Sequence, residues 1–167
     1  GAGQDLIVHA AASTGIPFST RHPVFDWSNN VDVTLRLLES IQLQPAPRSK
    51  LVVLSSVKPY DLAALHSREI SSCYELRGVA VDEKFPLSAD EPYAASKAAQ
   101  SFLVQSFAKA WGLDAIVFRC SNLYGPAPCH GPRHGWLTWL CIQAALGWSI
   151  EIQGNGKQTR DMLYATD

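Results

Sequence analysis

Three short apolar runs mark the first two thirds of the chain. Residues 5–10 (DLIVHA), 51–56 (LVVLSS) and 114–119 (DAIVFR) are apolar without a regular alternation of polar positions. Strands that are buried on both faces of a parallel sheet have this pattern. We therefore expect three buried strands.

Stretches with helical spacing separate these runs. Between the first two runs, apolar residues recur at Val31, Leu35, Leu38 and Ile41, and the pattern stops before Pro45. Between the second and third runs, a helix is predicted from about Pro92 to Gly112, with proline in its first turn and glycine after its last.

The alternation of strands and helices predicts an α/β fold. Right-handed crossovers would build a doubly wound, Rossmann-like parallel sheet with helices on both faces. Such sheets bind ligands at the carboxyl ends of their strands.

The remaining segments are less regular. Residues 57–90 contain no clear element, and a loop of this length in a compact domain usually has a function. After residue 124 we predict a Gly/Pro loop, a helix over 136–146, a short strand over 149–153 (SIEIQ) and a glycine turn at GNG. Residues 1–124 are thus expected to form one domain and residues 125–167 the start of a second lobe.

Composition and charge exclude several classes of partner. The net charge of -1 provides no basic field for nucleic acid or for a charged membrane. The longest apolar run, residues 136–150, is too short to span a bilayer. No secretory signal is legible, and the four cysteines lack C-x-x-C spacing, so we expect reduced thiols and a cytoplasmic protein.

A metal site is not predicted. Cys129, His130 and His134 are close in sequence, but a fourth ligand at a suitable spacing is missing. We expect a solvated loop there.

Tyr93 and Lys97 are the first candidates for chemistry. Residues four apart share one face of a helix, and a nearby ammonium would lower the pKa of a tyrosine that acts as a general base. The alternative is a solvated pair with no function, because this spacing occurs often by chance. Ser55 and Ser56 end the preceding strand, so all four side chains would meet at one edge of the sheet.

Six motifs give the chain a wider resemblance. They are HAAAS (9–13), NNVDVT (29–34), LSSVKPY (54–60), PYAASK (92–97), FRCSNLYGP (118–126) and GNGKQTRDMLY (154–164). In this order they resemble the extended short-chain dehydrogenase/reductase family, and within it the NAD-dependent nucleotide-sugar epimerases and dehydratases. The long insert between Ser56 and Tyr93 and the tract after the Y-G-P turn are most similar to the CDP-paratose 2-epimerase (tyvelose epimerase) type.

The resemblance implies a catalytic set. Tyr93 would exchange a proton with the sugar, Lys97 would hold the nicotinamide ribose of NAD, and Ser56 would hydrogen-bond the reacting hydroxyl. The sugar would pass through a keto intermediate and receive the hydride on its other face.

It also implies binding residues. The cofactor would lie along His9, Ala10, Ala11, Ala12, Asn30 and Ser55, and the nucleotide sugar would contact Asn122 and Arg160. Without the resemblance, each has a simpler structural explanation: packing for the alanines, a polar helix position for Asn30, a turn for Asn122, and a surface pair with Asp161 for Arg160.

The chain lacks part of the family pattern. It resembles about the central half of a family member, and no glycine-rich turn leads from a strand into a helix. GAGQDL at the start runs directly into a strand, and GNGKQT is followed by no helix. We therefore expect an incomplete dinucleotide-binding domain that is inactive in isolation.

Three other functions stay open. A UDP-sugar 4-epimerase would share the same catalytic set. A dehydratase usually carries Asp and Glu directly after the serine position, where this chain has Val57 and Lys58, which disfavours it. The chain could also be a non-catalytic remnant that acts as a binding or assembly module. Pairing of two copies through the Tyr93 helix is expected by analogy with the family.

Overall fold

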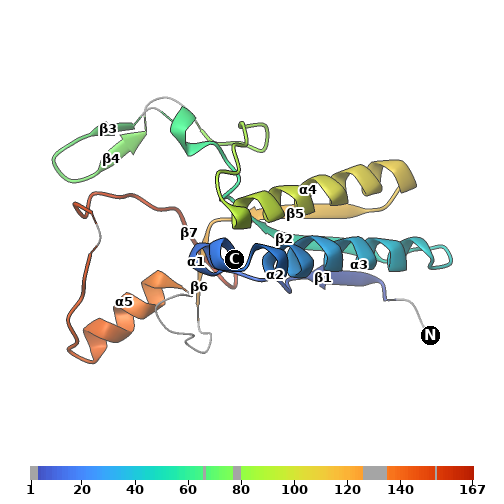
Figure 1. Ribbon diagram of the computed structural model, residues 1–167, viewed down its shortest axis with the longest axis horizontal. Helices are drawn as coiled ribbons and strands as arrows, with labels where there is room; N and C mark the ends of the chain where they lie inside the picture. The colour runs from blue at the N-terminus through green and yellow to red at the C-terminus, as the bar shows by residue number, and fades with distance from the viewer. Residues whose placement is uncertain (1–3, 66, 77–79, 126–134, 153) are drawn as a thin grey trace. The chain divides into compact units, whose positions relative to one another are not determined.

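The computed structural model describes residues 4–65, 67–76, 80–125, 135–152 and 154–167. The chain forms two compact units (Figure 1). The first comprises Gly1–Tyr60 and Leu87–Cys120, and the second comprises Asp61–Pro86 and Ser121–Asp167.

A parallel sheet is the centre of the first unit. It contains β1 (Leu6–His9), β2 (Lys50–Ser56) and β5 (Ala115–Cys120), in the order β1-β2-β5. In the register, Val8 lies opposite Val52, and Ser56 at the end of β2 lies opposite Cys120. The three predicted strands and their parallel arrangement are confirmed.

Two helices connect these strands, α3 (Val33–Gln42) and α4 (Pro92–Trp111). The start of α4 follows an extended Glu91, and Pro92 occupies the first helical position, where a missing N–H costs nothing. Gly112 ends the helix with φ 65°, and its N–H donates to the carbonyl of Ala108. Both predicted ends of α4 are confirmed.

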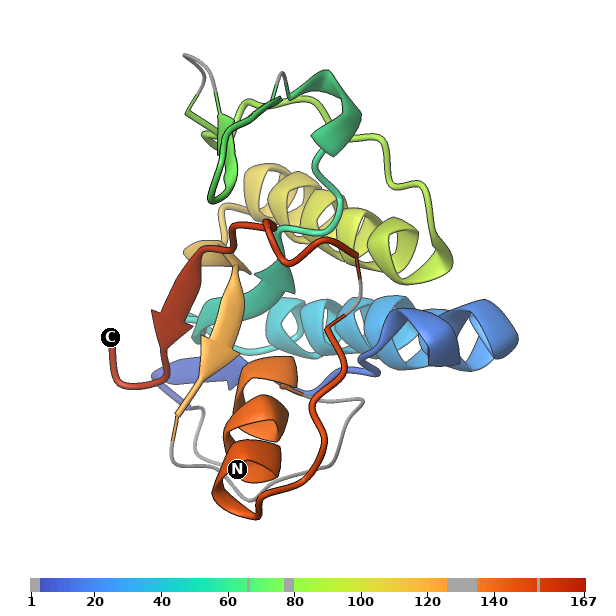
Figure 2. The ribbon, with the colours of Figure 1, turned by 90° about the vertical axis from the view of Figure 1, so that its left-hand side faces the viewer.

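The apolar core lies between the sheet and these helices. Its buried members are Leu38, Ile41, Leu51, Val53, Val104 and Leu113. Figure 2 shows α3 and α4 on the same side of the sheet. On the other side, four apolar side chains of the outer strands are at least 51% exposed: Leu6, Val8, Ile116 and Phe118.

The expectation of helices on both faces is therefore wrong for the described residues. The strand order runs in one direction from β1 to β5, so two right-handed crossovers lie on the same face. Helices reach the second face of a doubly wound sheet only when the order reverses at a switch point.

The polar stretch after β1 is more regular than predicted. It forms α1 (Ile16–Arg21), α2 (Pro23–Trp27) and a π-helical turn, η1 (Ser28–Asp32), which continues into α3. Pro17 and Pro23 each lie in the first turn of their helix, where proline is tolerated.

The second unit is built from short elements. They are the 3₁₀ turn η2 (Leu62–Ala64), the antiparallel hairpin β3 (Ser67–Glu69) and β4 (Tyr74–Leu76), the parallel pair β6 (Asn122–Tyr124) and β7 (Met162–Tyr164), and α5 (Trp136–Ala145). Figure 2 shows β6 and β7 side by side.

The strand predicted over 149–153 is wrong over its described residues. Residues 149–152 form no strand, and Ile150 and Ile152 are 41% and 66% exposed. The run alternates like a strand, but β6 pairs with residues 162–164 instead. A strand requires a partner, which the local pattern does not reveal.

The contacts also divide the chain differently from the predicted boundary after residue 124. The first unit ends at Cys120, because β6 pairs with β7 in the second unit. Residues 61–86 belong to the second unit as well, since Tyr74 donates its backbone N–H to the carbonyl of Lys157.

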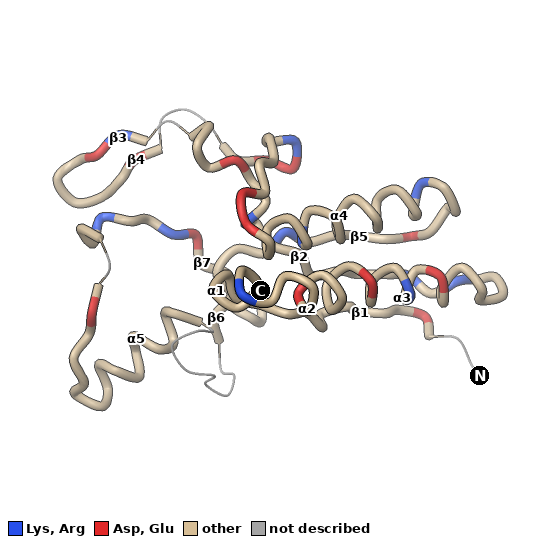
Figure 3. The backbone as a smooth tube through the Cα atoms, viewed as in Figure 1, with Lys and Arg blue, Asp and Glu red and all other residues tan. Residues whose placement is uncertain are grey.

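Both signs of charge occur in both units, while α5 carries no charged residue. Acidic and basic residues are interleaved along the described backbone (Figure 3). None of the helices in the described ranges is long and apolar enough to cross a membrane.

The packing between α3 and the sheet predicts the effect of truncating Leu38, which is 0% exposed. We expect Leu38→Ala to lower the free energy of unfolding by about 2 to 5 kcal/mol, because it leaves a cavity in the core. Leu43→Ala is the control: that side chain is 84% exposed, and its loss should change stability by less than about 0.5 kcal/mol. Urea unfolding followed by circular dichroism measures both, and equal effects would contradict this core assignment.

Candidate active site

The structure brings Ser56, Tyr93 and Lys97 together at the carboxyl end of β2. Ser56 is the last residue of the strand, and Tyr93 and Lys97 lie in the first turns of α4. The Ser56 hydroxyl acts on the Tyr93 phenol and lowers its pKa. Lys97 Nζ donates to the carbonyl oxygen of Leu54 at 3.2 Å. This is the edge at which parallel sheets bind ligands.

Tyr93 is protonated in this environment. Burial raises the pKa of its phenol, and the negative groups of Asp26, Glu91 and Cys120 raise it further. Only the Ser56 hydroxyl acts in the opposite direction. The predicted lowering by Lys97 is absent from these causes.

Lys97 is itself buried, and this burial changes its own pKa. The side chain is 2% exposed, and desolvation lowers its pKa to about 8. The ammonium is thus mostly present near pH 7 and loses its proton as the pH rises through about 8, before the phenol titrates. Electrostatic attraction by Asp26 first, and by the Cys120 thiolate where that group is ionised, opposes the lowering of the Lys97 pKa.

The ammonium of Lys97 has two acceptors. Besides Leu54, its Nζ donates to Oε1 of Gln100 at 3.0 Å. An ammonium has three N–H donors, so one is left to meet a further acceptor at the strand end.

Ser55 faces the helix. Its hydroxyl donates to the carbonyl of Lys97 at 3.2 Å and lies 3.0 Å from the hydroxyl of Ser101. Ser55 therefore ties β2 to α4.

The residues after β1 divide into a buried and an accessible group. His9 is buried, with Nε2 3.0 Å from the hydroxyl of Thr34. Burial, followed by the charge of Lys97, lowers the pKa of His9, so its imidazole is neutral at neutral pH. Ala10 and Ala11 are exposed and Ala12 is half-buried, so a ligand could approach this backbone.

Asn30 connects this segment to α4. Its side-chain amide makes two bonds to the backbone of Ser13, accepting from N at 2.8 Å and donating to O at 3.2 Å. It also donates to the hydroxyl of Ser96 at 3.0 Å. Asn30 lies in the π-helical turn, and its carbonyl accepts from the side chains of Thr34 and Gln100. These bonds hold the segment after β1 against α4.

Several residues of this polar cluster were not predicted. They are Asp26, Thr34, Ser96, Gln100 and Ser101, and each is at most 1% exposed. The spacing within α4 contained a signal: Tyr93, Ser96, Lys97, Gln100 and Ser101 recur at the positions that core residues of a helix normally occupy. We call these five residues the polar row of α4. Polar side chains that face a core need hydrogen-bond partners, so the polar row indicates a buried hydrogen-bond network.

Asn122 and Arg160 belong to the second unit. The amide of Asn122 donates to the carbonyl of Asp161 at 3.0 Å and accepts from the indole of Trp136 at 3.1 Å. Arg160 is exposed and donates to the carbonyl of Thr159 at 2.7 Å. Asn122 is the first residue of β6 and not part of a turn, and the start of this strand lies beside the segment that contains Arg160.

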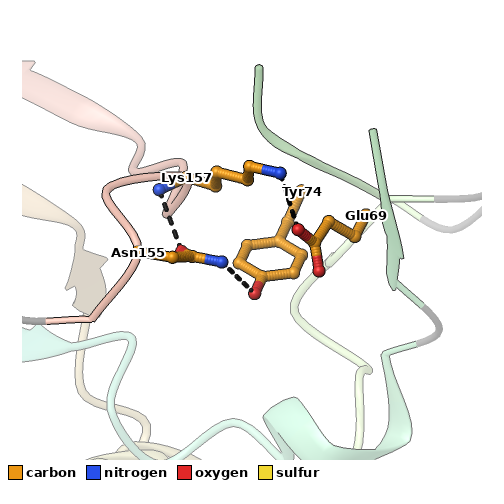
Figure 4. Close-up of polar contacts among 4 residues, drawn as sticks. All are labelled: Glu69, Tyr74, Asn155 and Lys157. Carbon is orange, nitrogen blue, oxygen red and sulfur yellow. Dashed lines mark hydrogen bonds and ion pairs between the residues drawn. The ribbon is translucent and has the colours of Figure 1, made fainter. Parts of the chain in front are cut away.

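The hairpin of the second unit holds the residues that precede Arg160 (Figure 4). Lys157 forms an ion pair with Glu69 at 2.6 Å, and Asn155 donates to the hydroxyl of Tyr74 at 2.8 Å. Thr159 donates to the carbonyl of Tyr74 at 3.2 Å. The sequence offered no signal for these contacts, which join residues more than 80 positions apart.

Cys129, His130 and His134 lie outside the described residues. Elsewhere, the described part of the chain contains no group of three or more His, Cys, Asp or Glu side chains that could hold a metal ion.

Comparison with known proteins gives a consistent family. The sequence model of the NAD dependent epimerase/dehydratase family matches residues 2–167. CDP-paratose 2-epimerase from Salmonella typhi is 32% identical over 98% of this chain and 50% of its own length.

Two solved structures have a similar fold. UDP-N-acetylglucosamine 4-epimerase from Methanobrevibacter ruminantium, in complex with UDP-N-acetylmuramic acid, has a TM-score of 0.81 at 26% identity, over 96% of this chain and 47% of that one. dTDP-glucose 4,6-dehydratase from Bacillus anthracis, in complex with NAD, has a TM-score of 0.72 at 28% identity, over 97% and 44%.

This chain spans about half the length of the curated relatives it matches. The parallel sheet, the crossover helices and the Tyr93 and Lys97 positions belong to the matched region. The chain is a member of the NAD-dependent epimerase/dehydratase family, whose homologues act as nucleotide-sugar epimerases and dehydratases.

Proposed function

We propose that this chain contains the catalytic centre of an NAD-dependent nucleotide-sugar epimerase of the CDP-paratose 2-epimerase type. The observation that carries the proposal is the cluster of Ser56, Tyr93 and Lys97 at the carboxyl end of β2. The likeness to the Salmonella typhi enzyme supports this choice of sugar chemistry. We expect the protein to act in the cytoplasm.

The described residues would suit contacts with a ribose and with the nucleotide part of NAD. The third N–H of Lys97 suits a ribose hydroxyl, and the accessible backbone of Ala10, Ala11 and Ala12 suits close approach of a nucleotide. The sequence has no glycine-rich turn that opens a helix, so the pyrophosphate would need a cradle from elsewhere. When bound, NAD supplies the hydride chemistry.

The side chains of the cluster would handle the proton. Tyr93 would take the proton of the sugar hydroxyl and later return it. The Ser56 hydroxyl lowers the pKa of Tyr93 and thus favours this step, while burial raises it. A positive charge near the phenol would lower the pKa of Tyr93 further. A protonated Lys97 would provide such a charge.

The second unit would recognise the nucleotide sugar. The exposed guanidinium of Arg160 suits the paired oxygens of a diphosphate. Asn122 would contact the nucleotide sugar, and its contacts with Trp136 and the carbonyl of Asp161 fix the orientation of its amide.

Two other enzyme activities compete with this proposal. A UDP-sugar 4-epimerase would use the same three catalytic residues. A 4,6-dehydratase must also remove water, which needs an acid and a base beside Ser56. Val57 has a hydrocarbon side chain and Lys58 an ammonium, and the backbone N–H of Lys58 donates to Ser56 Oγ at 3.2 Å. This chemistry favours an epimerase.

A binding or assembly module without catalysis is the alternative of another class. Two copies could pair through α4, where Phe102 is 58% exposed. Product analysis with CDP-, UDP- and GDP-sugars, supplied to the longest natural protein that contains these residues, would separate the enzyme activities from each other and from this alternative.

Cofactor binding is the first prediction. We expect calorimetry to detect NAD binding by the longest natural form and not by the 167-residue chain, because the chain has no phosphate cradle of its own. If neither folded form binds NAD, the enzyme proposal fails and the non-catalytic module replaces it.

The second prediction concerns Tyr93. In the longest natural form, Tyr93→Phe should reduce kcat by about 10²-fold or more, because the phenol that exchanges the proton is lost. Binding of NAD should persist. Tyr124→Phe, which alters a tyrosine 37% exposed in the second unit, serves as the control and should keep its activity. Full activity of Tyr93→Phe would remove Tyr93 from the catalytic set.

A further inference from the structure

One acidic and one basic side chain lie deep inside the first unit. Asp26 is 1% exposed and Lys97 is 2% exposed, and the other acidic and basic side chains of the described residues, apart from the imidazole of His9, are more exposed than these. Asp26 comes from α2 and Lys97 from α4. The interior of this unit therefore holds one carboxylate and one ammonium.

Hydrogen bonds alone do not compensate Asp26. Its Oδ2 accepts from the hydroxyl of Ser96 at 2.5 Å, and its buried Oδ1 has no hydrogen-bond partner in the described structure. An isolated buried charge strongly destabilises a fold unless an opposite charge offsets it. Asp26 thus needs a positive group.

Lys97 is the cation that fits. It follows Ser96, the hydrogen-bond donor to Asp26, in α4, and both side chains are almost fully buried in the same unit. Among the described residues, Lys97 Nζ donates to Leu54 and Gln100 while Asp26 accepts from Ser96, so any attraction between the two charges acts without a direct hydrogen bond. The negative charge of Asp26 is the largest influence that opposes the lowering of the pKa of Lys97 by burial.

The other groups around Lys97 are neutral near pH 7. His9 on β1 has a lowered pKa, and Cys120 on β5 and Tyr93 on α4 have raised ones. Glu91, whose carboxyl interacts with Lys58 and Asp90, acts on Tyr93 at the start of α4. Asp26 on α2 is then the charged group that acts on Lys97 at this pH.

We propose that Asp26 is a positioning residue for Lys97: its buried carboxylate keeps the Lys97 side chain charged and, through Ser96, fixes the turn of α4 that carries Tyr93 and Lys97. The contacts of Ser96 support the second part, because its hydroxyl also lies 3.0 Å from the carbonyl of Tyr93 and 3.0 Å from the amide of Asn30. The proposal rests on the proposed function only for the role of Lys97 in catalysis.

Titration of Lys97 tests the charge coupling. Nitrogen-15 NMR of the lysine ammonium groups, with Lys97→Met to assign the signal, follows the protonation of Lys97 in the longest natural form. Asp26→Asn keeps an acceptor for Ser96 and removes the charge, so the Lys97 midpoint should move to lower pH by about one unit. Asp26→Glu should restore it, and Glu39→Gln, at an exposed acid on α3, should leave it unchanged.

A double-mutant cycle tests the same coupling without a pH change. Lys97→Met alone leaves the carboxylate of Asp26 uncompensated, whereas Lys97→Met with Asp26→Asn removes both charges. From urea unfolding, we expect the folding equilibrium constant of the double variant to exceed the additive expectation by about tenfold or more. Additive effects, together with an unmoved Lys97 midpoint in Asp26→Asn, would overturn the proposal.

The outcomes also separate this proposal from the proposed function. Activity that survives Tyr93→Phe would contradict the catalytic assignment but not the coupling. An unchanged Lys97 midpoint would contradict the coupling even if Tyr93→Phe is inactive. If Asp26→Asn alone fails to fold, the comparison of Lys97→Met with the double variant still decides: the coupling predicts that adding Asp26→Asn to Lys97→Met raises stability, and a further loss of stability would overturn it.

Discussion

The bond from Lys97 to the carbonyl of Leu54 joins α4 to the end of β2 from inside the fold. Because Ser55 also bonds to the backbone of Lys97, the first turns of the helix are fixed against the strand by polar contacts. Tyr93 stands one turn earlier and therefore lies next to Ser56. The position of the whole candidate site follows from how α4 is seated on the sheet.

The contacts that α4 makes with the rest of the unit are apolar at one end of the helix and polar at the other. At its far end, α4 packs through Val104, Phe107 and Trp111 against the apolar core. At its start, the same face carries the polar row that includes Lys97 and Gln100. The apolar end stabilises the unit, since burial of hydrocarbon is the main favourable contribution to folding. The buried polar side chains at the start of α4 need hydrogen-bond partners in suitable positions. Their main effect is therefore to fix the position of the helix start.

The sequence predicted the elements whose causes are local. Pro92 and Gly112 bound α4, and the apolar runs define the strands of the parallel sheet, because capping chemistry and burial patterns act within a few residues. It did not predict that Asp26 meets Ser96, or that Tyr74 meets Asn155, since these bonds join residues 70 and 81 positions apart. It also placed a strand at residues 149–153, of which residues 149–152 are described and form none, and it missed β7, whose pairing with β6 is decided by tertiary structure.

The candidate residues of the two units are held by different kinds of contact. In the first, the buried network leaves little freedom, since each side chain of the row has at least one partner from another element, as Ser96 has in Asp26 and Gln100 has in Thr34. In the second, Arg160 is exposed, and its segment is held through its neighbours by the hairpin around Tyr74. A change in that hairpin would therefore reach the backbone beside Arg160 while the polar row of α4 keeps its own contacts. With the roles proposed above for Arg160 and Tyr93, substrate choice would vary separately from proton chemistry, because the two residues depend on different sets of hydrogen bonds.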